Sequence, residues 1–323
     1  MMKFHLILSV FICAVTFPLL SWSADPARTA DIAVRDLTKS DFPRWKELAP
    51  NVYAYADLLT SAGTTLTTVS LIVVTSDGVV IVDGQNTVVQ GEAMVRNIKK
   101  ITSQPIKYMV IASDHGDHVN ANPAFKAAYP DIVFISSPVS QKVLSRIDFR
   151  SEASKSGTLP TEVVSDKRTL SLGGTDIQIL NLGRGHTGGD LIVYLPKSKV
   201  LFLGELYLRY VFPAMVSAYP SEWVALLKKV QTMDVSWFVP GHGFIGDSEE
   251  VMKVGLDDAL EATEHVISEA KRLYAKGLTC EVETNCPAMK EANWESYSDW
   301  TLYSSQAPRA LARVYKEIEG KLP

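Results

Sequence analysis

The amino-acid sequence predicts an α/β protein, arranged as a four-layer αβ/βα sandwich with a C-terminal helical extension. Three observations support this fold class. Strand-like runs open the folded part of the chain, strand and helix patterns then alternate in two successive halves, and the final part is helical. Two αβ halves that face each other place two sheets in the middle and helices outside. With 46% hydrophobic residues, the 323-residue chain can bury a sizeable core.

The N-terminus is typical of a secretory signal peptide. Lys3 provides the positive charge, Leu6 to Leu20 form an apolar run, and Ser21 and Ser23 are the small residues expected before cleavage at Ala24. The apolar run is short for a bilayer-spanning helix of about 20 residues, so we expect cleavage rather than a retained membrane anchor. The mature protein would then be secreted or periplasmic, with no membrane attachment.

The strands begin after a polar segment without a clear period, which we interpret as an N-terminal arm. Runs rich in β-branched and aromatic residues follow at 52–55, 64–74 and 79–82. Glycine and aspartate turn signals separate them, which favours an antiparallel meander.

Strand and helix patterns then alternate along the chain. The first half predicts a helix at 88–100, a strand ending at 112, a helix at 121–129 and a strand at 132–136. The second half predicts strands at 168–181, 190–195 and 199–204, a helix at 221–232 and a strand at 237–239. Apolar residues at helical spacing follow at 247–276 and 307–318. We therefore expect a signal peptide at 1–23, an arm at 24–48, the main domain at 49–245, and a helical extension of that domain at 246–323.

The charge distribution argues against a nucleic-acid partner. The formal net charge is -4, and the lysine and arginine residues are scattered rather than clustered. The sequence therefore predicts no nucleic-acid partner.

Two cysteines remain after removal of Cys13 with the signal peptide. Cys280 and Cys286 lie close together in a chain sent to an oxidising compartment, so a disulfide is the simplest interpretation. A zinc pair is the alternative, but two thiolates without a nearby histidine do not complete a tetrahedral site.

Polar residues that can bind metal follow several of the predicted strands. His115, Asp117 and His118 lie in one short stretch after the apolar run that ends at Ala112. His186 in GRGHTGGD, Glu205 in LFLGELY and His242 in VPGHG each follow a strand-like run and lie among glycines. Imidazoles and carboxylates in these numbers are the ligands that Zn²⁺ takes. His265, inside the long predicted helix, is expected to be a surface or packing residue.

These residues occur in an order that resembles the metallo-β-lactamase-fold superfamily, over roughly residues 50–245. The family has an Asp after an early strand, a His-x-His-x-Asp-His motif, a Gly-His-Thr loop, a Gly-Asp after a strand and a late Gly-His. Here the corresponding residues are Asp83, Ser113-x-His115-x-Asp117-His118, His186, Glu205 and His242. Residues 49–245 would accordingly form a metallo-β-lactamase-like domain.

The resemblance implies two metal positions that share Glu205. One would consist of His115 and His186, with Ser113 as a weak or water-mediated ligand in place of the family's histidine. The other would consist of Asp117, His118 and His242. We expect one tightly bound Zn²⁺ and a second that is weak, with the longer Glu205 side chain compensating in part for Ser113. Asp83 would not bind the metal itself but would hold the loop that carries the metal ligands in place.

The resemblance also implies a metal-dependent hydrolase, β-lactamase- or lactonase-like. Metal-bound hydroxide would attack an ester, lactone, thioester or β-lactam, and Asp117 would orient it and manage its proton. Tyr207, Arg209 and Tyr210 follow Glu205 and are expected to bind an acidic group of the substrate.

Two alternatives remain open at the level of sequence. A non-enzymatic protein that keeps a metal for an accessory role is supported by Ser113 alone. Persulfide dioxygenases of the same fold hold one iron with three residues, and two of those positions are Ser113 and Glu205 here. This departure argues against the iron enzyme.

Overall fold

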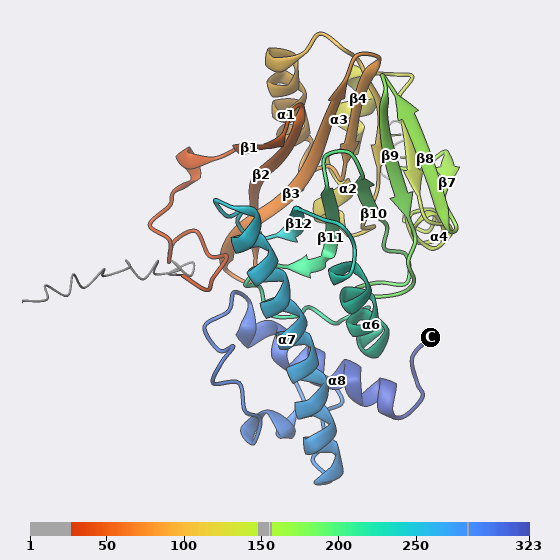
Figure 1. Cartoon of the computed structure of the whole chain (residues 1–323). Helices are drawn as coiled ribbons and strands as arrows, with labels where there is room; N and C mark the ends of the chain where they lie inside the picture. Colours follow the sequence, from red (N-terminus) through yellow and green to blue (C-terminus); the bar gives the residue numbers. More distant parts are fainter. Residues whose placement is uncertain (1–26, 148–154, 156, 283) are drawn as a thin grey trace, which may run out of the picture.

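The computed structural model describes residues 27–147, 155, 157–282 and 284–323 (Figure 1). The predicted signal peptide with Cys13 lies outside the described residues. The predicted antiparallel meander is confirmed, with each strand paired to the next. It consists of β1 (Arg44–Ala49), β2 (Val52–Ser61), β3 (Thr64–Thr75) and β4 (Gly78–Val82).

The strand β1 lies almost wholly in the segment that the sequence analysis assigned to the N-terminal arm. The indole ring of Trp45 in β1 packs edge-on against the Tyr55 ring of β2, with ring centroids 5.1 Å apart. This cross-strand contact stabilises a segment that lacks its own periodicity. The arm otherwise contains a short 3-10 helix at Lys39–Asp41.

The predicted alternation of strands and helices is present in both halves. The first half continues with α1 (Val88–Ile101), β5 (Ile106–Val110), α2 (Gly116–Val119), α3 (Asn122–Ala128), β6 (Val133–Ser136), α4 (Pro138–Leu144) and β7 (Glu162–Val163). The second half contains β8 (Lys167–Leu172), β9 (Thr175–Leu180), β10 (Ile192–Leu195), β11 (Val200–Leu208), α6 (Pro220–Gln231) and β12 (Trp237–His242). Thr87 caps α1, because its side chain accepts a hydrogen bond from the Gln90 N–H.

The two central sheets are halves of one continuous hydrogen-bonded sheet. Its strand order is β7-β6-β5-β4-β3-β12-β11-β10-β9-β8, with β2 and β1 attached at β3. The halves join where β3 pairs with β12, at Thr68 and His242. The sheet therefore curls, and its two halves take the places of the two predicted sheets.

The four layers follow from alternating burial along the strands. Ile72, Ile81 and Met109 belong to a core with residues of α1 and α3. Their strand neighbours Leu71 and Val82 belong to a second core, which also contains residues of β11, α6 and α7. Side chains on successive strand positions point to opposite faces, so one half of the sheet is covered on both sides.

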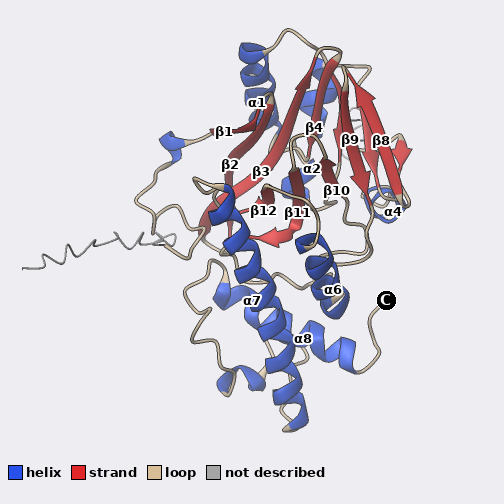
Figure 2. Ribbon diagram, viewed as in Figure 1, coloured by secondary structure: helices blue, strands red, loops and turns tan. Residues whose placement is uncertain are grey.

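The C-terminal extension is helical, as predicted. It contains α7 (Glu249–Ala275), a 3-10 helix at Pro287–Lys290 and α8 (Tyr303–Ile318). Figure 2 shows α7 and α8 extending away from the strands. Ser248 caps α7 by accepting a hydrogen bond from the Val251 N–H, and two glutamates in the first turn favour the same helix end.

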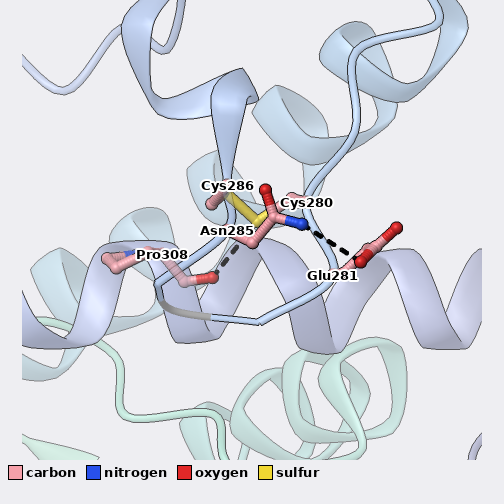
Figure 3. The surroundings of a disulfide bond; sticks show 5 residues. All are labelled: Cys280, Glu281, Asn285, Cys286 and Pro308. Carbon is pink, nitrogen blue, oxygen red and sulfur yellow. Dashed lines mark hydrogen bonds between the residues drawn. A yellow bond between two sulfur atoms is a disulfide. The ribbon is translucent and has the colours of Figure 1, made fainter.

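Cys280 and Cys286 form a disulfide next to α8 (Figure 3). The Cys280 Sγ lies 3.4 Å from the carbonyl oxygen of Pro308, which belongs to that helix. Inside the loop, the Asn285 side-chain amide donates to Glu281 at 3.1 Å.

The disulfide is expected to stabilise the protein. Replacing both Cys280 and Cys286 by serine should lower the free energy of unfolding by roughly 2 kcal/mol, because the crosslink restricts a short loop in the unfolded chain. Denaturant unfolding of the wild type with and without reductant gives the matched comparison. Non-reducing peptide mapping of exported protein that found both thiols free would contradict the prediction.

Candidate metal centre

Seven polar side chains converge at one end of the sheet. The segment after β5 carries four of them, the loop before β10 carries one, and β11 and β12 each carry one. They are Ser113, His115, Asp117, His118, His186, Glu205 and His242. Functional side chains are commonly gathered in this way at the carboxyl ends of parallel strands, and β11 and β12 are parallel.

Two glycines, Gly241 and Gly204, fit the backbone of β11 and β12 at this point. A Cβ atom on Gly241 would lie 2.6 Å from the backbone carbon of Gly204 and 2.8 Å from the Glu205 nitrogen. Gly204 itself has φ of 54°, in the left-handed region that glycine adopts without strain. A side chain at position 241 would push Glu205 away from His242.

The first group of potential ligands consists of Asp117, His118, Glu205 and His242, and its donor atoms all lie within 4.8 Å of one another. The Nε2 atoms of His118 and His242 are 3.3 Å apart. The His242 Nε2 lies 3.2 Å from Asp117 Oδ2 and 3.5 Å from Glu205 Oε1. Two imidazoles and two carboxylates thus surround one small volume.

The second group consists of His115, His186 and Glu205. The His115 Nδ1 lies 2.7 Å from Glu205 Oε2, and the His186 Nε2 lies 3.3 Å from Glu205 Oε1. Glu205 belongs to both groups, so its two oxygens can serve two adjacent cations. The resemblance to the metallo-β-lactamase fold likewise implies a carboxylate at position 205 that is shared by two metal positions.

The orientation of two histidines fits a divalent metal. The Nδ1 of His242 is 2.8 Å from the carbonyl oxygen of Thr67, which can only accept a hydrogen bond, and the Nδ1 of His118 is 2.9 Å from Asp83 Oδ2. Neutral imidazoles held in this way carry lone pairs on both Nε2 atoms, and these atoms face each other. A cation between them removes the repulsion, and outer partners of this kind typically orient zinc-binding histidines.

The acidic side chains of the cluster strongly favour a positive charge at this position. The charge of Glu205 raises the pKa of His115 to about 9. Burial lowers the pKa of His242, but hydrogen bonds to Asp117 and Glu205 outweigh burial and raise it to about 10. Burial raises the pKa of Asp117, yet the neighbouring His118 and His242 bring it down to about 2. The cluster therefore favours positive charge, whether a proton or a metal ion supplies it.

Asp83 has the contacts that a bracing residue needs. It is fully buried, and its Oδ1 accepts hydrogen bonds from the backbone N–H groups of Ala112 at 2.7 Å and Ser113 at 3.3 Å. The other oxygen faces His118. One carboxylate thus connects the backbone of the ligand loop to a ligand side chain.

Ser113 contacts a ligand directly. Its hydroxyl donates a short hydrogen bond to Glu205 Oε2, the same oxygen that faces His115. The serine thereby fixes the rotamer of the longer carboxylate in the space near the second group. Asp114 belongs to neither group.

Tyr207, Arg209 and Tyr210 do not lie where the sequence analysis expected them. All three are buried, with at most 4% of each side chain exposed. The Tyr207 hydroxyl donates to the Met252 carbonyl of α7, and Arg209 donates to the Phe244 carbonyl. The register of β11 against β12 shifts between Gly204 and Leu208, which turns the following side chains away from the face of Glu205. Their burial, outside the lining of the cavity that contains His115, Asp117 and Glu205, argues against the expectation that they bind substrate.

His265 lies outside the cluster, as expected. Its Nε2 is 2.7 Å from the Asn293 carbonyl oxygen, and its ring packs against Trp294 and Tyr297. It is a packing residue of the helical extension.

A cavity of about 180 Å³ opens over the candidate metal centre. The residues His115, Asp117, His186, Glu205 and His242 form its floor. Its walls include Leu208 of β11 and, from α8 and the residue before it, Gln306 and Leu302. The sequence analysis missed these wall residues, because a leucine or glutamine in an amphipathic helix carries no signal of its own.

Comparisons with known proteins agree with the fold. Residues 63–242 match the family model described as the metallo-beta-lactamase superfamily. A linear primary-alkylsulfatase from Pseudomonas sp. (strain ATCC 19151) is 24% identical over 246 residues, which cover 63% of this chain and 46% of that protein. A metallo-beta-lactamase type 2 from Bacillus sp. (strain 170) is 24% identical over 209 residues, covering 62% of this chain and 76% of the relative.

Solved structures show the same architecture. A metallo-beta-lactamase from Pontibacter korlensis superposes with a TM-score of 0.59 at 22% identity, covering 68% of this chain and 99% of its own. The metallo-beta-lactamase IND-7 gives a TM-score of 0.55 at 22% identity, with 66% and 97% covered. The predicted fold class is confirmed.

Proposed function

Because the chain belongs to the metallo-beta-lactamase superfamily, we propose that it is a zinc-dependent hydrolase of small molecules. The observation that supports this function best is the pair of donor groups that share Glu205 beneath a cavity. Asp117, His118 and His242 would hold one ion, His115 and His186 would hold the other, and Glu205 would contact both. A bound zinc ion supplies Lewis-acid activation of water and of the scissile carbonyl.

The residues of the chain would orient the reaction. Asp117 faces both the cavity and His242, so its carboxylate can hold an attacking water and accept its proton. Asp83 and the Thr67 carbonyl keep the imidazoles of His118 and His242 in the orientation that directs Nε2 inward.

We further propose an ester, lactone, thioester or β-lactam as the substrate and an exported location. The predicted signal peptide supports export. Within the part of the chain that the structure describes, no helix is long and apolar enough to span a bilayer.

A hydrolysis screen tests the proposed function. Lactones, thioesters, aryl esters and β-lactams would be presented to the full-length mature protein with zinc, with chelator, and with zinc restored. We expect turnover that chelator removes and zinc recovers. Tight zinc binding without turnover of any compound would favour the non-enzymatic accessory role.

Zinc stoichiometry is expected to show one tight site and one weak site. His115 and His186 supply two imidazoles where the resemblance implies three, because residue 113 is a serine, and its hydroxyl donates a hydrogen bond to Glu205. Ser113→His should tighten the weak site in a titration against a metallochromic chelator.

The double variant Ser113→His with Glu205→Asp is the control for crowding between the new imidazole and the longer carboxylate. Two equally tight zinc ions in the unmodified protein would contradict the prediction.

A further inference from the structure

A second cavity lies between β1 and the start of α7, apart from the one over the candidate metal centre. Its volume is about 640 Å³, within the range of about 300–1,000 Å³ that is typical of small-molecule sites. None of the described residues that line it also lines the cavity over the metal centre. Ala54 and Ala56 lie on the same face of β2, and their small side chains leave room for the cavity. It is therefore a separate candidate binding site.

The lining of this cavity is mainly cationic, although the whole chain has a net charge of -4. The charged residues among the described ones that line it are Arg35, Arg44, Lys46, Arg209 and, with the opposite sign, Asp247. Arg209 is buried, so it contributes positive charge rather than a contact. Asp247 is fully exposed and lies 3.8 Å from Lys46 Nζ, so water screens that ion pair. An anion in this cavity would face an excess of positive charge.

Two guanidinium groups flank a pair of phenyl rings in this cavity. The Arg35 guanidinium carbon lies 4.4 Å from the centroid of the Phe244 ring. The Arg44 guanidinium carbon lies 6.0 Å from the centroid of the Phe42 ring. The centroids of the two rings are 6.3 Å apart, and all four residues line the cavity. Flat apolar surfaces and positive charges therefore lie side by side.

Arg44 and Lys46 are the cationic groups that can reach a ligand. Arg44 is exposed, and no ion pair of its guanidinium occurs within the described residues. The Lys46 Nζ donates to the Gly246 carbonyl at 2.6 Å, and an ammonium group has two further N–H donors. Arg35 is instead held by two backbone carbonyl groups of the N-terminal arm, at 2.7 Å each. Arg44 is thus the group best placed to pair with an anion.

We propose that this cavity binds an aromatic carboxylate. A guanidinium group pairs with a carboxylate through two parallel N–H···O bonds, which Arg44 can supply, and Lys46 can donate a further bond. The planar ring of the ligand would lie against the half-buried ring of Phe42. This site is separate from the metal centre, and the inference does not rest on the proposed hydrolase function.

Calorimetric titration of the full mature, zinc-loaded protein tests the proposal with three probes. They are 2-naphthoate, its uncharged analogue 2-naphthamide, and acetate, which has the carboxylate without the ring. We expect 2-naphthoate to bind at least about tenfold more tightly than either other probe, because it alone can contact both the cations and the phenyl rings. Acetate or 2-naphthamide binding as tightly as 2-naphthoate would overturn the inference.

Arg44→Gln distinguishes this cavity from the metal centre, where a carboxylate can also contact zinc. The variant should weaken 2-naphthoate binding by at least about tenfold and leave 2-naphthamide binding and zinc content unchanged. Arg96→Gln makes the same change at an exposed arginine of α1 outside the cavity, and it should leave the affinity for 2-naphthoate unchanged. Equal affinity for 2-naphthoate in the wild type and Arg44→Gln would overturn the inference, as would an equal loss in both variants.

Phe42→Leu tests the contact with the ring of the ligand. This variant keeps an apolar side chain but removes the flat surface, so it should weaken 2-naphthoate binding by roughly threefold or more. The affinity for acetate should not change, because acetate has no ring. A Phe42→Leu protein that bound 2-naphthoate as tightly as the wild type would contradict the proposed position of the ligand.

Discussion

Replacing His118 or His242 by alanine is expected to abolish tight zinc binding and to lower kcat/KM by at least about 100-fold. Each change removes one imidazole from the group that also contains Asp117 and Glu205. Loss of an outer partner of a metal ligand typically costs 10- to 100-fold in metal affinity or activity, so loss of the ligand itself should cost at least as much. Zinc content by elemental analysis and steady-state kinetics on the same samples would measure both effects.

His265→Ala is the matched control for these variants. Its imidazole packs against Trp294 and Tyr297 of the helical extension and belongs to neither donor group. Zinc content and kcat/KM should remain at wild-type values. The ligand assignment would be wrong if this variant lost zinc to the same extent as His118→Ala.

Glu205→Gln is expected to have the largest effect on total zinc. The carboxylate of Glu205 is 2.7 Å from His115 Nδ1, 3.3 Å from His186 Nε2 and 3.5 Å from His242 Nε2. An amide of the same shape removes the negative charge from both positions at once, so the affinity of both zinc ions should fall. Competition titration with a chelator would show two weakened sites.

Glu269→Gln is a suitable control for Glu205→Gln. Glu269 is also buried, but its carboxylate accepts hydrogen bonds from Arg272 in α7. This change should weaken that ion pair and leave both zinc affinities unchanged. A Glu205→Gln protein that kept the wild-type zinc affinity at either position would show that Glu205 is not shared between them.

The main elements of the fold could be predicted from the sequence because each has its own local pattern. β4 is a short apolar run in which all five residues are buried, and α1 begins at a threonine cap. β1 could not be predicted in this way, since the contact of Trp45 with Tyr55 stabilises it from another strand. The joining of the two sheet halves at Thr68 and His242 is likewise a long-range pairing.

The polar residues of the candidate site could also be located from the sequence, because they lie after strands and among glycines. The surroundings of these residues could not be predicted from the sequence. The irregular register after Gly204 turns Tyr207 and Arg209 toward α7, while simple alternation would keep them on the face of Glu205. Gln306 comes to the cavity only through the packing of α8, about 100 residues further along the chain.

Zinc anomalous scattering from crystals of the full mature protein grown with zinc would test the central claim most directly. The account predicts a strong peak among Asp117, His118, Glu205 and His242, and a second peak of lower occupancy among His115, His186 and Glu205. Anomalous density found only elsewhere on the protein, with none at this cluster, would contradict it.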